Sequence, residues 1–335
     1  MKISLNFKLK QGPYGGGNQF GLALTSYLNE KGVNVVRNLR HADIDIILFL
    51  GSQGAIVNYR YPAIARYLLL CNPHALVVQR VNECDERKGT TKINPILRRA
   101  NRLADYTVFV SSWLRDLHVG QGMKPNHPHV IHNGSDTEIF NPKDHQPWDG
   151  DGPLKIVTHH WSDNWMKGFD IYQRLDEMLE SPDFRMKYSF TYIGNLPPDF
   201  TFKHATYIPP TNGTDLANKL REHHVYITAS RNEPGSNHQN EGALCGLPLM
   251  YIDSGSMGEY CQGYGVEFTV DNLEQKLSEM RSTYPEWVSR MADFPYNARR
   301  MCMVYDALFE EMLHNREELL SRRRKDVNLL QFVIR

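Results

Sequence analysis

The sequence is poor in cysteine, and its cysteines are not spaced for a zinc ribbon or a disulfide framework. Among 335 residues there are five, an odd number without a CxxC pair: Cys71, Cys84, Cys245, Cys261 and Cys302. Small secreted domains depend on paired cysteines, and structural zinc sites need closely spaced ones. We therefore expect reduced thiols in a cytoplasmic protein.

Long hydrophobic runs are also missing. The longest apolar stretch, residues 44–57, contains Asp45, Ser52 and Gln53, and it is too short to span a bilayer. The N-terminal residues do not show the pattern of a signal peptide. These absences argue against a membrane-spanning helix and leave peripheral membrane contact open.

The chain has no net charge, with 38 basic and 38 acidic side chains, but the charges are unevenly distributed. Residues 1–142 carry 17 Lys and Arg against 10 Asp and Glu (+7), so the remainder carries 21 against 28 (−7). An excess of one sign favours partners of the other. For the basic part we expect an anionic second ligand or the inner membrane surface, and not nucleic acid. The basic run at residues 322–325 is expected to be a solvated tail.

Apolar, strand-like segments alternate with helical patterns along most of the chain. Residues 44–50, 75–78 and 106–110 are examples in the first half, and the alternation restarts at residues 154–158. Buried runs separated by helices predict parallel sheets of the α/β class, which bind ligands at the carboxyl ends of their strands.

A stretch rich in Asp, Gly and Pro, residues 143–153, interrupts this alternation near mid-chain and indicates a linker. A chain of this length can bury two cores. We therefore predict one α/β domain at residues 1–142 and a second at 154–297. Residues 298–335, which begin with apolar positions at helical spacing, are predicted to form a last helix and a tail.

A glycine-rich segment follows the first predicted strand. Residues 11–17 read Gln-Gly-Pro-Tyr-Gly-Gly-Gly and precede a helical pattern, a combination that brings backbone close to a phosphate or a sugar. The spacing departs from GxGxxG and no acidic residue closes the next strand, which argues against a dehydrogenase. The segment also resembles the N-terminal glycine loop of the glycosyltransferases of family 4, which borders the donor phosphates and the acceptor. The resemblance implies that Gly16 and Gly17 bind the donor and that Tyr14 and Gly15 lie on the acceptor side, with a purely structural turn as the alternative.

Two glutamates in the second half are placed for a polyol ligand. Glu233 follows an apolar strand pattern at residues 225–229, and Glu241 comes after it with seven residues between the two. Each carboxylate accepts hydrogen bonds from sugar or ribose hydroxyl groups. The pair therefore suits a ligand rich in hydroxyl groups.

The residues between these glutamates predict a turn and the start of a helix. Pro234 and Gly235 favour the turn, and Ser236 or Asn237 can cap the helix that follows. Free backbone N–H groups at such a turn attract an anion, most often a phosphate. We predict that Gly235, Ser236 and Asn237 bind this phosphate.

The stretch from Glu233 to Glu241 resembles the Glu-x7-Glu signature of the retaining glycosyltransferases of family 4. Residues 132–142, His-Asn-Gly-Ser-Asp-Thr-Glu-Ile-Phe-Asn-Pro, resemble the passage with which that family leaves its first domain. The resemblance implies the GT-B architecture, in which two Rossmann-like parallel α/β domains face each other across a cleft and a C-terminal helix crosses back to the first. It also implies transfer of a sugar from a nucleotide-diphosphate sugar with retention at the anomeric carbon.

The same resemblance implies roles for individual residues. Glu233 meets the transferred sugar, Glu241 meets the ribose, and Lys167 neutralises the donor pyrophosphate. The family usually has an arginine six residues before this lysine, where the present chain has Trp161. We expect Arg231 or backbone donors to compensate for the missing cation.

The other predicted contacts fall on loops after strands. The resemblance places the nucleobase against Tyr207, Ile208 and Pro209, although Tyr207 also suits a core position. Arg80, Asn82 and Glu83 leave the end of a predicted strand and are candidates for the acceptor side, unless Arg80 and Glu83 only pair with each other. We expect a glycan, a lipid-linked or another small molecule as the acceptor.

No metal or other cofactor is expected. Protein cations and helix amides can stabilise the leaving diphosphate, and no Asp-x-Asp triplet stands out as suited to hold a metal. His159 and His160 are adjacent on a predicted strand, where their side chains point to opposite faces, so packing or hydrogen bonding is expected of them.

Two other functions fit the same residues. One is a nucleotide-sugar epimerase on the same fold, which needs no second substrate. The other is a catalytically silent carbohydrate-binding relative, suggested by the missing arginine.

Overall fold

Two units make up the computed structural model, which describes residues 1–10, 16–51 and 57–333. Unit 1 contains residues 1–133 and 298–335, and unit 2 contains residues 134–297. The division falls between Asn133 and Gly134, earlier than the boundary after Pro142 that the linker composition suggested. The reason is that Ser135 already joins unit 2, where its N–H donates to the carbonyl of Tyr296 at 3.4 Å.

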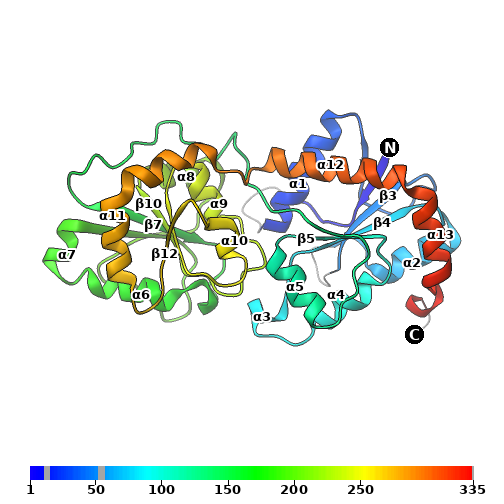
Figure 1. The fold of residues 1–335 in the computed structure, drawn as a ribbon, viewed down its shortest axis with the longest axis horizontal. Coiled ribbons are helices and arrows are strands. Elements are labelled where there is room, and N and C mark those ends of the chain that lie inside the picture. The colour runs from blue at the N-terminus through cyan, green and yellow to red at the C-terminus, as the bar shows by residue number, and fades with distance from the viewer. Residues whose placement is uncertain (11–15, 52–56, 334–335) are drawn as a thin grey trace. The chain divides into compact units, whose positions relative to one another are not determined.

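Unit 1 is built on a parallel sheet whose described strands have the order β2-β1-β3-β4-β5-β6. These strands are β1 (Lys2–Leu5), β2 (Asn34–Val36), β3 (Ile46–Leu50), β4 (Leu76–Val81), β5 (Tyr106–Phe109) and β6 (Pro128–Val130). Figure 1 labels the neighbouring strands β3, β4 and β5 of this sheet. Every residue of the central β3 and β4 is buried, as expected for strands covered on both faces. The order reverses between β1 and β3, so a ligand site in this sheet is expected beside the carboxyl ends of those two strands.

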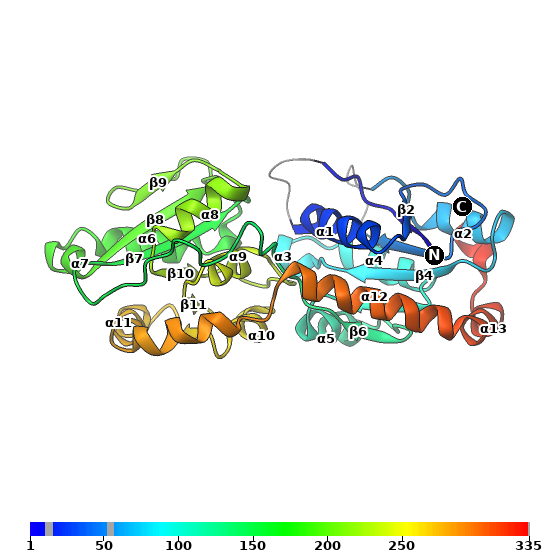
Figure 2. The ribbon, with the colours of Figure 1, turned by 90° about the horizontal axis from the view of Figure 1, so that it is seen from above.

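The helices of unit 1 come from both ends of the chain. They are α1 (Gly16–Glu30), α2 (Tyr61–Leu70), α3 (Asp85–Lys88), α4 (Ile93–Asn101), α5 (Ser112–Gly120), α12 (Ala298–His314), α13 (Arg316–Asp326) and the short η3 (Leu329–Phe332). The α12 helix packs along α1 (Figure 2), where the rings of Phe20 and Tyr305 are 5.1 Å apart. Its apolar face is part of the same core as β1 and β3.

The basic run at residues 322–325 is only partly the solvated surface that its charge suggested, since Arg324 and Lys325 are exposed but Arg323 is not. Arg323 is buried, with its guanidinium bound to the carboxylate of Asp105 and to the carbonyl of Pro73. A buried charge needs such a partner because its removal from water is otherwise costly. Beyond it, the ring of Phe332 packs edge-on against Tyr61 at 6.1 Å.

Unit 2 is built on a second parallel sheet, with the described order β12-β11-β10-β7-β8-β9. Its strands are β7 (Leu154–His160), β8 (Tyr188–Gly194), β9 (Thr206–Ile208), β10 (Val225–Thr228), β11 (Leu249–Tyr251) and β12 (Gly265–Glu267). The chain runs outward from β7 to β9, returns to β10 and then runs outward in the other direction. The order therefore reverses between β7 and β10, which pair in register through Ile156 and Val225.

The helices of unit 2 connect these parallel strands. They are η1 (Trp165–Lys167), α6 (Phe169–Met178), α7 (Pro182–Lys187), α8 (Gly213–Arg221), α9 (His238–Leu244), α10 (Met257–Cys261), α11 (Leu273–Arg290) and η2 (Met291–Asp293). The prediction of an α/β protein with two parallel sheets is confirmed. Within the described parts of both units, no helix is both long and apolar enough to cross a bilayer.

Candidate functional site

The predicted donor residues gather where the strand order of unit 2 reverses. His159 lies near the carboxyl end of β7, and Lys167 follows it in η1. Glu233 comes after β10, and Glu241 lies on α9. Because β7 and β10 are neighbours and parallel, their carboxyl ends meet at one edge of the sheet, which is where α/β proteins bind ligands.

Lys167 and Glu233 form a buried ion pair at this edge. The ammonium nitrogen of Lys167 lies 2.5 Å from Glu233 Oε1, and the two side chains are only 12% and 5% exposed. Gly168 makes the approach possible, since it has φ +97° and a Cβ there would lie 2.4 Å from the Cβ of Ala229. A larger residue at position 168 would push η1 away from the end of β10 and separate the pair.

The backbone of Glu233 is held by the small-residue turn that follows β11. Glu233 forms a parallel bridge with Gly255, and its carbonyl accepts a hydrogen bond from Ser256 N–H at 2.8 Å. The preceding residue, Asn232, has φ +51°, and its N–H donates to Ser254 Oγ at 3.0 Å. This left-handed conformation is unusual for a side chain other than glycine and is sustained here by the surrounding contacts.

Glu241 contacts a histidine, whereas Glu233 contacts a lysine. Its Oε2 lies 2.7 Å from His159 Nε2, and the side chains of Glu241 and His159 are 6% and 10% exposed. Asn237 occupies the cap position of α9, while Ser236 and Gln239 bind each other, with Gln239 Nε2 donating to the carbonyl of Ser236 at 2.7 Å. The helix therefore begins where the sequence predicted.

Buried histidines and tyrosines connect these residues into a polar cluster. The hydroxyl of Tyr226 lies 3.1 Å from His159 Nδ1 and 3.3 Å from His238 Nδ1. His160 Nε2 lies 2.7 Å from the hydroxyl of Tyr172. Burial raises the pKa of Tyr172 to about 12 and also raises that of Tyr226, so both keep their hydroxyl protons. Both histidines of β7 are hydrogen-bonded, which is one of the two roles expected of them from the sequence.

Sequence reasoning did not identify the contact between His159 and Glu241, nor Tyr226 as part of the site. The contact depends on the pairing of β7 with β10, and the order of strands in a sheet cannot be read from the strands themselves. A histidine at the carboxyl end of a buried strand was the available signal.

Arg231 is paired with an acidic side chain. Its guanidinium binds both carboxylate oxygens of Asp170, at 2.8 and 2.6 Å. Burial acts to raise the pKa of Asp170, but the hydrogen bonds and charge of Arg231 outweigh it and hold that pKa below its ordinary value. As a cation for the diphosphate, Arg231 therefore has to share its charge with Asp170.

Trp161 directly follows β7, with its side chain 51% exposed and its carbonyl accepting a hydrogen bond from Asn195 Nδ2 at 2.6 Å. Tyr207 is also exposed, which excludes the core position that the sequence left open. Exposed aromatic rings near the carboxyl ends of strands are suited to stacking on a planar or sugar ligand.

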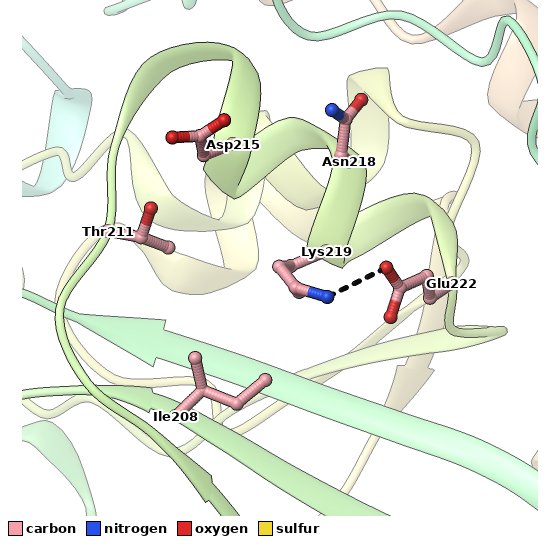
Figure 3. A pocket seen from close by; sticks show the side chains of 6 residues that line it. All are labelled: Ile208, Thr211, Asp215, Asn218, Lys219 and Glu222. Atoms are coloured by element: carbon pink, nitrogen blue, oxygen red, sulfur yellow. Dashed lines mark hydrogen bonds and ion pairs between the residues drawn. The ribbon is translucent and has the colours of Figure 1, made fainter.

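A shallow hollow of about 370 Å³ lies between β9 and α8 (Figure 3). Among the predicted nucleobase contacts, Ile208 lines this hollow, and Tyr207 and Pro209 do not. The other lining residues are Thr211, Asp215, Asn218, Lys219 and Glu222, with Lys219 and Glu222 forming an ion pair at 3.0 Å. The hollow contains neither glutamate of the pair, so it is separate from the Lys167–Glu233 contact.

The glycine-rich segment of unit 1 is described only in part. Tyr14 and Gly15 lie outside the described residues, whereas Gly16 and Gly17 begin α1. A side chain at Gly17 would lie 3.8 Å from Asn82 Nδ2, so α1 starts beside the end of β4.

Arg80 and Glu83 do not pair with each other. Arg80 is buried beneath α1, with its guanidinium 4.0 Å from the ring centre of Phe20 and donating to Asn133 Oδ1 at 2.7 Å. Glu83 binds Lys88. Arg80 thus fixes Asn133, the last residue before the chain enters unit 2.

Among the described side chains, no group of three or more His, Cys, Asp and Glu residues is arranged to hold a metal ion. The chain has two Asp-x-Asp triplets, at residues 43–45 and 149–151. In the first, Asp43 binds Lys2 and Asp45 binds Arg316.

The N-terminal part of the chain matches the model of a known family. Residues 14–139 match the family model described as Glycosyltransferase Family 4. A search of curated protein sequences found no significant match.

Several solved structures share the fold over almost their whole length. HepE of Anabaena in complex with UDP has a TM-score of 0.66 at 13% identity, and the match covers 92% of this chain and 99% of HepE. The catalytic domain of starch synthase IV from Arabidopsis thaliana, bound to ADP and acarbose, has a TM-score of 0.65 at 12% identity, with coverage of 92% and 98%. Sucrose-phosphate synthase from Thermosynechococcus elongatus has a TM-score of 0.64 at 12% identity, with coverage of 93% and 99%.

At these identities the likeness establishes the fold. The chain joins a region that matches glycosyltransferase family 4, residues 14–139, to a two-unit α/β fold that it shares with GT-B proteins. The predicted resemblance to this family is confirmed over that region and in the fold.

Proposed function

We propose that the protein is a retaining glycosyltransferase, which moves a sugar from a nucleotide-diphosphate sugar to a glycan, lipid-linked or small-molecule acceptor. The observation that carries the proposal is the Lys167–Glu233 ion pair, with Glu241 on the next helix, at the edge of the sheet where the strand order reverses. HepE was solved with UDP and with UDP-glucose, and starch synthase IV with ADP, which supports a nucleotide sugar as donor.

In this proposal the two glutamates hold different parts of the donor. Glu241 accepts hydrogen bonds from the ribose, a part that does not react. Glu233 faces the transferred sugar, near the carbon where positive charge develops, and its carboxylate helps more in the transition state than before it. Lys167, which is paired with Glu233, also neutralises the diphosphate in this proposal.

The chemical step needs no nucleophilic side chain. The bond from the anomeric carbon to the diphosphate oxygen breaks, and the acceptor oxygen forms a new bond on the same face of the sugar. The acceptor proton passes to the leaving diphosphate oxygen. Lys167 and the backbone amides of Gly235, Ser236 and Asn237 stabilise the charge that develops on the diphosphate.

Aromatic residues complete the donor site in the proposal. Tyr207, Ile208 and Pro209 contact the nucleobase, and Trp161 stacks where the family has an arginine. Arg231 contributes part of the missing positive charge while it remains bound to Asp170. On the acceptor side we retain Asn82 and Glu83 as contacts, with Arg80 supporting them from the interior of unit 1.

The test is an assay with a panel of UDP-, ADP- and GDP-sugars, each with and without a mixture of glycan and lipid acceptors. Release of nucleoside diphosphate only in the presence of acceptor, with a product of unchanged anomeric configuration by NMR, is the expected result. Epimerisation of a donor without acceptor would identify an epimerase instead. Binding of donors without turnover under any condition would identify a silent carbohydrate-binding protein.

A further inference from the structure

The contact between His159 and Glu241 is more than a packing contact, because it uses one particular oxygen of the carboxylate. Glu241 Oε2 lies 2.7 Å from His159 Nε2. In the described part of the chain, Oε1 of Glu241 has no hydrogen-bond partner. One oxygen is thus committed to the protein, and the other is available to a ligand.

The histidine is itself oriented from behind by Tyr226. Three groups lie within hydrogen-bond distance of the Tyr226 hydroxyl: His159 Nδ1 at 3.1 Å, the His159 carbonyl at 3.2 Å and His238 Nδ1 at 3.3 Å. The nearest is His159 Nδ1. The same hydroxyl accepts a hydrogen bond from His159 N–H at 3.2 Å, so both the backbone and the ring of His159 are tied to it.

This arrangement selects one tautomer of His159. Because burial raises the pKa of Tyr226, its hydroxyl remains protonated and can donate to Nδ1 as well as to the His159 carbonyl. A neutral imidazole that accepts at Nδ1 carries its proton at Nε2, and it then donates that proton to Glu241. The chain of donors runs from Tyr226 through His159 to the carboxylate.

The packing leaves these groups little freedom to rearrange. The α9 helix is pressed onto the Tyr226 ring at Gly242, where an added Cβ would lie 2.4 Å from a ring carbon. His159 and Tyr226 belong to the paired strands β7 and β10. A carboxylate held in this way pays little orientational entropy when a ligand binds, which raises affinity through pre-organisation.

We propose that His159, held by Tyr226, is a positioning residue that directs Glu241 Oε1 toward the ribose hydroxyl groups of the donor. This inference rests on the proposed function and adds the source of discrimination between ribose and deoxyribose. His159 itself does not touch the donor, and it acts through Glu241.

The test measures binding of UDP, ADP and GDP by calorimetry, and then of the 2′- and 3′-deoxy forms of the diphosphate that binds most tightly. The variants are His159→Phe, which keeps a ring and removes the donor, His159→Gln, which keeps an N–H donor, and Glu241→Ala. His159→Phe combined with Glu241→Ala completes a double-mutant cycle. Thermal melting of each variant reports on folding.

We expect His159→Phe to weaken binding of the ribose diphosphate about threefold to tenfold, the effect of a lost hydrogen bond. The variant should bind the corresponding deoxy diphosphate within about twofold of the affinity that the parent protein shows for it. The discrimination between ribose and deoxyribose therefore falls. His159→Gln should recover most of it, and His159→Phe should have no further effect once Glu241 is alanine.

Equal weakening of the ribose and deoxy forms, or full additivity in the cycle, would show that His159 only supports the fold and would overturn the inference. If His159→Phe does not fold, Tyr226→Phe provides the same test, because it removes only the hydroxyl that fixes the tautomer. Failure of the parent protein to bind any of the three diphosphates would instead overturn the proposed function, and this inference with it.

Discussion

Glu233 and Glu241 are the same residue type, have seven residues between them and are both buried in unit 2, yet their surroundings differ. Glu233 lies in a loop with a non-glycine residue of positive φ before it, and its partner is the cation Lys167. Glu241 lies on a helix, and its partner is an imidazole fixed by a tyrosine. The difference teaches that the side chain in contact with a buried glutamate, more than the carboxylate itself, decides which chemical role that glutamate can have.

The largest effect is expected from Glu233→Gln, which keeps the shape of the side chain and removes its charge. We expect kcat to fall by about 100-fold or more, since the lost interaction acts mainly in the transition state. Affinity for nucleoside diphosphate should stay within about threefold, because Lys167 remains available to the diphosphate. Steady-state kinetics and calorimetry measure the two quantities. Near-normal kcat with strongly weakened diphosphate binding would reverse the role assignment.

A smaller effect, of a different kind, is expected from Glu241→Ala. The ribose does not react, so its hydrogen bonds contribute similarly to the ground state and the transition state. Affinity for donor and free diphosphate should fall about 10- to 150-fold, the range for hydrogen bonds to a charged group. At saturating donor, kcat should change little. A dominant loss of kcat would mean that the two glutamates act as one unit.

A charge reversal in unit 1 should affect the acceptor and leave the donor unaffected, in contrast to changes at Glu233 and Glu241. Arg98 lies in the last turn of α4, in the basic part of the chain, and its neighbour Arg99 contacts the carbonyl of Gln331. We expect Arg98→Glu to raise the acceptor KM several-fold at low salt and to leave donor affinity unchanged. Arg66→Glu, a charge reversal at an exposed position of α2, is the matched control. Equal behaviour of the two variants would assign Arg98 to a solvated surface.

The smallest effect is expected from a chelator. Because Lys167 supplies the positive charge beside Glu233, the diphosphate needs no metal ion to neutralise it. Activity should therefore persist in EDTA within the error of the assay. Initial rates with and without EDTA, and after addition of magnesium or manganese, provide the measurement. Complete loss in EDTA that a divalent cation restores would contradict this role for Lys167.

Much of the fold follows from the sequence because buried parallel strands have a clear local pattern. The apolar runs that became β3, β4, β7 and β10 were each recognisable from residues in direct succession. The helix start after Pro234-Gly235 was also local, and with it came the spacing of the two glutamates.

Contacts that depend on the order of strands could not be derived in this way. The pairing of β7 with β10 brings His159 to Glu241, and neither segment encodes its neighbour. Charged side chains posed a second difficulty, because a solvated and a buried arginine look the same in sequence. Arg80 and Arg323 are buried because Asn133 and Asp105 bind them, and both partners are distant along the chain.

The return of residues 298–335 to unit 1 has a consequence for synthesis on the ribosome. Unit 2 is continuous, from residue 134 to 297, and its apolar cores draw only on residues within that range. Unit 1 instead lacks Tyr305, Phe309 and Met312 of its core until α12 has been made. Unit 2 can therefore fold first. Residues 1–133, although they are made earlier, cannot complete the core of unit 1 until residues 298–335 have been made.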